Sequence, residues 1–148
     1  MTHYKEDQLT MKKFRNWVTF AVVLAMVLSL AIGVSANTRS KSAGMYGTIR
    51  GSSYQSTSNI NLLDTTTSVT QNTDSAYFVI YVEFTNPSRV TSQETRSSGK
   101  GATSFNPSFA IYFTIDTVPS YAFVSHDIRG GTAAPSGYSC YTEAPISI

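Results

Sequence analysis

Hydrophobic residues alternate along the segment from Ser75 to Thr85, and this period of two predicts a β-strand. One face of the strand carries apolar side chains throughout: Ala76, Phe78, Ile80, Val82 and Phe84. The opposite face is also largely apolar and carries Tyr77, Val79, Tyr81 and Glu83. Because two apolar faces are typical of a strand in the middle of a sheet, we expect this one to be covered on both sides or to face a partner.

Other segments predict further strands. Alternation from Ser108 to Thr117 sends apolar side chains to one side: Phe109, Ile111, Phe113 and Ile115. The segment from Tyr121 to Ile128 follows Val118-Pro119-Ser120, a short connection that predicts a hairpin turn. Weaker strand signals lie at Met45–Tyr54, Ile60–Thr70, Thr91–Ser97 and Tyr138–Thr142.

Together these segments predict an all-β fold. After Ala36 no window shows an apolar period of 3.6 residues over three turns, so we expect almost no helix there. About six or seven short strands, separated by Gly, Pro and Asn, are typical of a small antiparallel β-sandwich or a barrel-like domain. We expect one hydrophobic helix to precede this domain, as a signal peptide.

The N-terminal region has the pattern of an export signal. In residues 11–36, three cationic side chains precede an uncharged, mostly apolar run from Trp17 to Val34. Val34-Ser35-Ala36 then places short side chains at the positions that signal peptidase recognises. We therefore expect cleavage between Ala36 and Asn37, with the export machinery and signal peptidase as partners.

An uncleaved membrane anchor is the alternative. No charged residue lies between Arg15 and Arg39, and the 23 residues between them match the roughly 20 that cross a bilayer. Contact with the membrane would be limited to residues 17–34, with the C-terminal domain outside. We expect a secreted, extracellular protein, and a membrane-anchored one if cleavage does not occur.

The expected organisation has four parts. Residues 1–10 form an extension, because Met11 opens a more typical signal peptide than Met1 and is a candidate for the true start. Residues 11–36 are the signal peptide or anchor. Residues 37–44 lack apolar periodicity, so we expect a flexible linker there. Residues 45–148 form the extracytoplasmic domain, which is rich in Ser and Thr: these make up 35 of the 112 residues from Asn37 onward.

The charge distribution argues against a nucleic-acid partner. The chain has 11 Lys and Arg against 9 Asp and Glu, for a formal charge of +2. After Ala36, however, seven basic residues are balanced by seven acidic ones, so the positive excess belongs to the N-terminal region. A neutral domain lacks the basic surface on which nucleic-acid binding depends.

Residues suited to metal or redox chemistry are few. Cys140 is the single cysteine, so it forms no internal disulfide, and with His3 and His126 it does not supply a zinc site. P-loop and calcium-loop motifs are absent, and we expect neither a metal nor a cofactor. Free cysteines are usually buried, which we expect for Cys140. The alternative is an intermolecular disulfide, since an odd cysteine in an exported protein can pair between chains.

Catalytic motifs are equally weak. Ser125-His126-Asp127 has the residue types of a hydrolytic triad, but neighbours on a strand point to opposite faces. No G-x-S-x-G elbow occurs, and we expect His126 to lie at a strand end and to hydrogen-bond a turn. Glu83 and Asp116 lie in strong strands, although their spacing does not establish the carboxylate separation that glycoside hydrolysis needs. We assign no catalytic residue and do not expect an enzyme.

Binding is the function class that the sequence favours. Tyr77, Tyr81 and Tyr112 would form a binding platform if they are not part of the core. The polar segment 91–103 and the loop 130–137 are the candidate contact regions. A short basic signal followed by a Ser/Thr-rich, Cys-poor β domain resembles exported proteins of Gram-positive bacteria, with no family motif.

We therefore expect an exported, non-enzymatic domain that binds an extracellular protein or glycan, or that has a structural role at the cell envelope. A secreted antimicrobial or toxin-like factor is the first alternative, since a small neutral β domain permits it. A small secreted hydrolase that uses His126 is the second.

Overall fold

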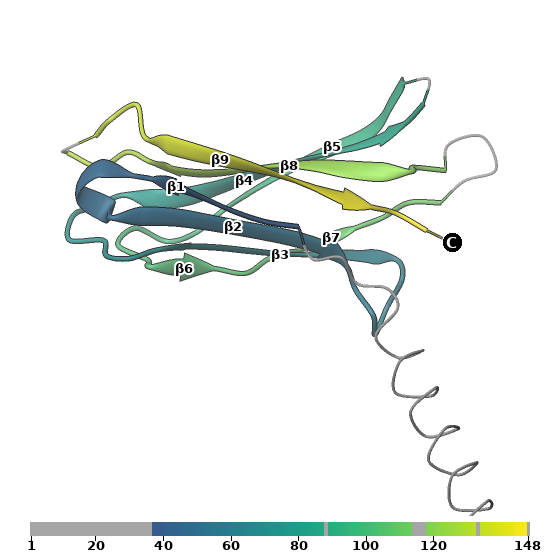
Figure 1. Ribbon diagram of the computed structural model, residues 1–148, viewed down its shortest axis with the longest axis horizontal. Coiled ribbons are helices and arrows are strands. Elements are labelled where there is room, and N and C mark those ends of the chain that lie inside the picture. The colour runs from purple at the N-terminus through teal and green to yellow at the C-terminus, as the bar shows by residue number, and fades with distance from the viewer. Residues whose placement is uncertain (1–36, 88, 114–117, 133, 148) are drawn as a thin grey trace, which may run out of the picture. The chain divides into compact units, whose positions relative to one another are not determined.

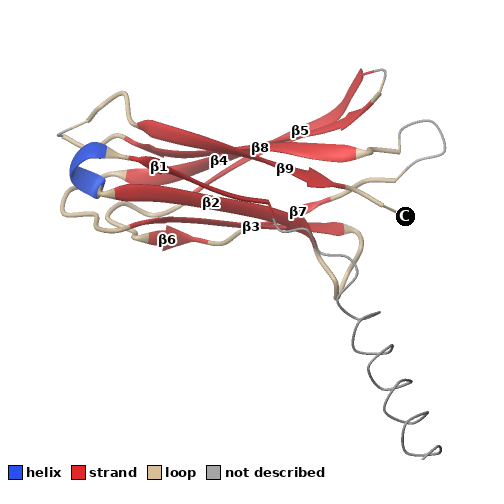
Figure 2. Cartoon of the chain, viewed as in Figure 1, coloured by secondary structure: helices blue, strands red, loops and turns tan. Residues whose placement is uncertain are grey.

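The computed structural model describes residues 37–147 apart from 88, 114–117 and 133. These residues fall in one of the chain's two units, Ser35–Ile148, and form an all-β fold of two antiparallel sheets packed face to face (Figure 1). Strands make up nearly all of its regular structure, and the helical element within this part is a single 3-10 turn, η1 (Gly44–Tyr46) (Figure 2). The predicted N-terminal helix, with Val34 and Ala36 of the expected cleavage site, lies outside the described residues.

The first sheet has the strand order β1-β2-β3-β6, with β7 also paired to β3. Its strands are β1 (Asn37–Ser42), β2 (Thr48–Gln55), β3 (Leu62–Val69), β6 (Ser104–Phe105) and β7 (Ser108–Ala110). Much of this sheet is built from Ser and Thr. The run Thr65-Thr66-Thr67 lies in β3, where β-branched side chains favour the extended backbone.

The second sheet has the strand order β5-β4-β8-β9. Its strands are β4 (Tyr77–Asn86), β5 (Arg89–Ser97), β8 (Tyr121–Arg129) and β9 (Tyr138–Pro145). The prediction that residues 75–85 form a central strand is confirmed, because β4 pairs with β5 on one side and β8 on the other. Its inner face is buried against the first sheet, whereas its outer face is only half-buried.

Three expectations about the strands differ from the structure. The predicted hairpin at Val118-Pro119-Ser120 is wrong, because β7 pairs with β3 in the first sheet whereas β8 lies in the second. Of the strand expected from Ser108 to Thr117, residues 108–110 form β7, residues 111–113 are not in a strand, and residues 114–117 lie outside the described residues. Residues 37–42, which we expected within a flexible linker, form β1, because their backbone pairs with β2 along the whole segment.

Two hydrophobic clusters fill the space between the sheets. One consists of Leu63, Ile80, Val82, Phe84, Phe109, Ile111, Ala122, Val124, Ala144 and Ile146. The other consists of Ala43, Tyr46, Ile49, Val69, Ala76, Phe78, Ile128 and Cys140. Each cluster takes side chains from both sheets, so their burial holds the sheets together.

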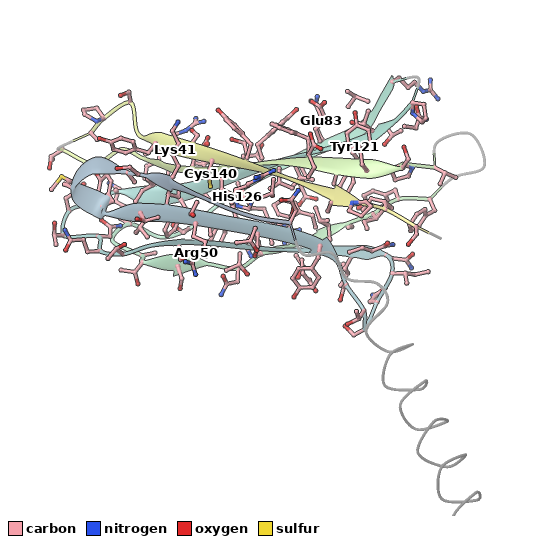
Figure 3. All side chains as sticks on the ribbon, in the orientation of Figure 1. Lys41, Arg50, Glu83, Tyr121, His126 and Cys140 are labelled. Carbon is pink, nitrogen blue, oxygen red and sulfur yellow. The ribbon has the colours of Figure 1, made fainter. Side chains whose placement is uncertain are left out.

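A polar layer centred on His126 of β8 separates the two clusters. His126 is 0% exposed, and its Nδ1 lies 2.7 Å from Thr67 Oγ1 on β3. Its Nε2 lies 2.8 Å from Thr142 Oγ1 on β9, which in turn lies 2.7 Å from Ser53 Oγ on β2. This chain of hydrogen bonds joins the two sheets, and Figure 3 shows His126 between them. Burial lowers the pKa of His126 to about 4, against a smaller opposing effect of Asp127.

Gly51 of β2 provides the space that the imidazole ring occupies. Gly51 is buried, and a Cβ atom on it would overlap Cδ2 and Cγ of His126. The position therefore requires a residue without a side chain because of this close approach.

The outer edge of the second sheet is formed by β5, whose inward-pointing side chains are polar. Arg96 and Glu94 form an ion pair at 2.7 Å, and they pair in register with the inward-facing Ile80 and Val82. The Arg96 guanidinium also lies 5.1 Å from the centre of the Phe109 ring on β7. Charges that point inward from an edge strand oppose the addition of another strand.

We predict that Gly51→Ala lowers the free energy of unfolding by about 1–3 kcal/mol, because the added methyl group overpacks the site of His126. Gly99→Ala is the matched control, since nothing lies within 4 Å of a Cβ atom there. Urea unfolding followed by circular dichroism measures both changes. Equal stability of the two variants would show that the imidazole does not lie over Gly51.

We also predict that stability falls as the pH decreases from 6.5 toward 4. The unfolded chain binds the His126 proton more readily than the folded chain, so the neutral imidazole stabilises the fold above pH 6.5 and this contribution is lost below it. The loss reaches about 3 kcal/mol at pH 4. His126→Gln keeps a donor and an acceptor but does not titrate, and its unfolding free energy should lack this part of the pH dependence. Parallel pH profiles for the two proteins would contradict the assignment.

Candidate functional site

Aromatic rings gather on the outer face of the second sheet. Alternation turns aromatic side chains outward from three neighbouring strands: Tyr77, Tyr81, Tyr121, Phe123 and Tyr141. The acidic side chains of Glu83, Asp127 and Glu143 point to the same side of the sheet, where Asp127 is only 2% exposed. We call these eight residues the aromatic face. Figure 3 shows two of its members, Glu83 and Tyr121, on the side of the sheet that points away from the first sheet.

Two Tyr-x-Glu segments occupy equivalent positions on this face. Residues 81–83 lie on β4 and residues 141–143 on β9, and both strands are antiparallel to β8 between them, so they run in the same direction. Ser125 of β8 pairs in register with both tyrosines, and Phe123 pairs with both glutamates. The two segments therefore occupy equivalent backbone positions two strands apart.

On β4 the tyrosine and the glutamate are joined by a hydrogen bond. Tyr81 Oη donates to Glu83 Oε2 at 2.8 Å, and Gln93 Nε2 of β5 donates to the same oxygen at 3.2 Å. Partial burial, together with the Glu83 carboxylate, raises the pKa of Tyr81. The phenol therefore stays protonated at neutral pH and remains a donor.

On β9 the tyrosine is held by a ring instead. Tyr141 is 54% exposed, and it stacks on Phe123 with ring centres 5.6 Å apart and planes at 21°. Stacked rings restrict each other's movement and leave one face of the outer ring open. Glu143 is exposed and forms no ion pair with any residue that the structure describes.

Asp127 differs from the two glutamates because its charge is neutralised. Arg129 Nη2 forms an ion pair with Asp127 Oδ2, and Ser125 Oγ donates to Oδ1 at 2.7 Å. Within the described part of the chain, the acidic groups of the aromatic face without a cationic partner are therefore those of Glu83 and Glu143.

The residues considered for hydrolysis do not form a catalytic set. His126 points into the core, whereas Ser125 and Asp127 point to the outer face, as the alternation of a strand predicted. His126 lies within β8 and bonds Thr67 and Thr142, so its expected place at a strand end beside a turn is wrong. Asp116, considered with Glu83, lies outside the described residues.

The structure brings together two of the three tyrosines considered as a platform. Tyr77 and Tyr81 share the aromatic face, whereas Tyr112 follows β7 of the first sheet and is 67% exposed. Our sequence analysis did not identify Tyr121, Phe123, Tyr141 or Glu143 as site residues. The repeated Tyr-x-Glu pattern was a signal in the sequence for Tyr141 and Glu143 only.

Cys140 lies on β9 beneath β1 and belongs to one of the core clusters. It is 4% exposed, and its Sγ lies 4.0 Å from the carbonyl oxygen of Arg39. Burial raises the pKa of the Cys140 thiol to about 11, so little of it is thiolate at neutral pH. An intermolecular disulfide, which stays a prediction, would require β1 to move away from this thiol.

The outer face of the first sheet has a different character. A hollow of about 160 Å³ there is lined by Thr48, Arg50, Ser68, Val69 and Thr70, and Figure 3 shows Arg50 on this opposite side of the molecule. The lining combines hydroxyl groups with one cation and contains no aromatic ring. It lacks the apolar area that a ring offers to a partner.

Among the described residues, no helix has the length and apolar character needed to cross a bilayer. No group of three or more His, Cys, Asp or Glu in this part is arranged to hold a metal ion. Comparisons with protein-family models, with curated proteins and with solved structures find no match for the chain.

Proposed function

We propose that the chain is an exported, non-enzymatic binding domain and that the aromatic face is its binding surface. The observation that carries this proposal is the outward row of aromatic rings beside two carboxylates that lack a cationic partner among the described residues. Exposed apolar patches bordered by polar groups mark interaction sites in proteins. A partner that covers these rings gains from the removal of their accessible area from water, which is largest for Tyr121 at 41% and Tyr141 at 54% exposed.

The N-terminal sequence supports the proposed export. The basic and apolar segments before Ala36 provide the export signal from which this part of the proposal starts.

The sheet face is favoured over the sheet edge as the contact surface. Strand addition is a common way for β domains to bind partners, but Glu94 and Arg96 point inward from the edge strand β5 and oppose it. The aromatic face offers side chains for contact, and those side chains do not have to leave a core to make it.

We predict that the culture medium of the host contains a soluble species whose intact mass corresponds to a chain starting at Asn37, because signal peptidase cuts after Ala36. The matched variant Ala36→Phe places a bulky side chain at the cleavage position and should shift the product to the full-length form. A wild-type chain found only in the membrane fraction at full length would support the anchor instead.

We further predict that the double variant Phe123→Ala, Tyr141→Ala binds cell envelopes of the host roughly tenfold or more weakly than the wild type, because central aromatic contacts dominate binding free energy. Sedimentation of labelled protein with isolated envelopes measures the affinity. Tyr112→Ala removes an exposed tyrosine from outside the aromatic face and should bind as the wild type does. Circular dichroism confirms that each variant is folded. Equal binding by all three proteins would refute the proposed surface.

A further inference from the structure

We infer that the ligand of the aromatic face is a linear polysaccharide of neutral or amino sugars that runs across the strands. This inference rests on the proposed function and names its ligand. It starts from the equivalent register positions of the two Tyr-x-Glu segments. Tyr81 and Tyr141 lie two strands apart in one row with Ser125, which places them about 9.6 Å from each other along that row.

Residue positions that repeat at a fixed spacing along one row favour a ligand that repeats in the same way. An extended β-linked polysaccharide presents equivalent faces of its sugar rings at intervals of one disaccharide, a length comparable with two strand spacings. An extended peptide repeats every two residues, or about 6.8 Å, and does not match this distance. A polyproline II helix repeats every three residues, or about 9.3 Å, and is the closest protein rival.

Hydrogen bonding separates these two ligands. Glu83 and Glu143 are acceptors, and ionised carboxylates make their strongest hydrogen bonds with donors of the ligand. Sugar hydroxyl and amino groups are such donors and lie at the rim of the rings. A proline-rich helix offers fewer of them, because its prolines have no backbone N–H. The pairing of an aromatic ring with a carboxylate at each position therefore favours the sugar.

Charge narrows the class of polysaccharide. Glu83 and Glu143 have no cationic partner among the described residues, whereas Asp127 is paired with Arg129. Two negative charges on the same face repel a polymer of uronic acids, phosphates or sulfates. Neutral sugars are tolerated, and amino sugars with free ammonium groups are attracted.

The row also has room for a chain that is longer than the two tyrosines. Ser125 separates Tyr81 from Tyr141 with a short side chain, so a sugar ring can lie between them. On the far side of β4 the rows continue onto β5 with Thr95 and Gln93, which are exposed polar residues. A ligand can therefore extend over the full width of the sheet.

The test measures binding of β-1,4-linked oligosaccharides of glucose, N-acetylglucosamine and glucosamine to the full chain by calorimetry. We expect at least one series to bind, with the hexasaccharide at least about tenfold tighter than the disaccharide, because a disaccharide reaches one tyrosine and the longer chain reaches both. Tyr81→Ala and Tyr141→Ala should each reduce hexasaccharide affinity to that of the disaccharide. Tyr112→Ala should leave it unchanged, and Glu143→Gln should weaken the glucosamine series most.

Three results would overturn the inference. They are no binding in any of the series, hexasaccharide binding that does not depend on Tyr81 and Tyr141, and tyrosine-dependent binding of a proline-rich peptide in place of the sugars. The envelope-binding experiment tests the proposed function independently of the ligand. If envelope binding depends on Phe123 and Tyr141 but the oligosaccharides do not compete, the binding surface stands and its ligand is not a polysaccharide. If envelope binding does not depend on Phe123 and Tyr141, both proposals are wrong.

Discussion

The two sheets depend on a buried hydrogen-bond chain that includes one neutral imidazole. His126 bridges Thr67 and Thr142, and Thr142 continues the chain to Ser53. Buried polar groups are costly unless they are paired, so these strands keep the relative positions that satisfy all four side chains. Gly51 adds a steric condition, because only a residue without a side chain leaves room for the ring.

This constraint also decides which side chains form the aromatic face. If β8 slipped by one residue, His126 would face outward and Phe123 would enter the core, because successive side chains of a strand point to opposite faces. With His126 held inside, Phe123 and Ser125 point outward between β4 and β9. The alignment of the two Tyr-x-Glu segments thus depends on a hydrogen-bond network on the opposite side of the same sheet.

Because two edges of the sheets are protected against strand addition, the aromatic face is the surface that is open to a partner. At one side β9 packs beside β1 and β2, where the thiol of Cys140 is covered. At the other side β5 directs Glu94 and Arg96 inward and Arg96 covers the ring of Phe109. Both arrangements discourage pairing with a further strand. Contact through side chains of the aromatic face needs no such pairing, and it leaves the core and its hydrogen bonds undisturbed.

The sequence by itself determined the features that follow from the period of a strand. The alternation at residues 75–85 predicted a central strand with a second apolar face, and the neighbouring positions of His126 and Asp127 predicted that they point apart. These predictions succeeded because side-chain direction is a local property of extended backbone. The same alternation predicted that Tyr77 and Tyr81 of β4 share one face, although the sequence left open whether that face is a binding platform or part of the core.

The tertiary structure alone decided which strands are neighbours. Val118-Pro119-Ser120 has the composition of a turn, and such a turn suits a crossover between sheets as well as a hairpin. Residues 37–42 have no apolar pattern, yet β2 supplies hydrogen bonds along their whole length. The two Tyr-x-Glu segments are far apart in the chain, and they lie in one sheet two strands apart only because β8 pairs with both β4 and β9. Strand order is set by backbone hydrogen bonds and by packing between distant segments. Because every residue except proline has the same backbone hydrogen-bonding groups, the sequence of one strand does not indicate which strand it pairs with.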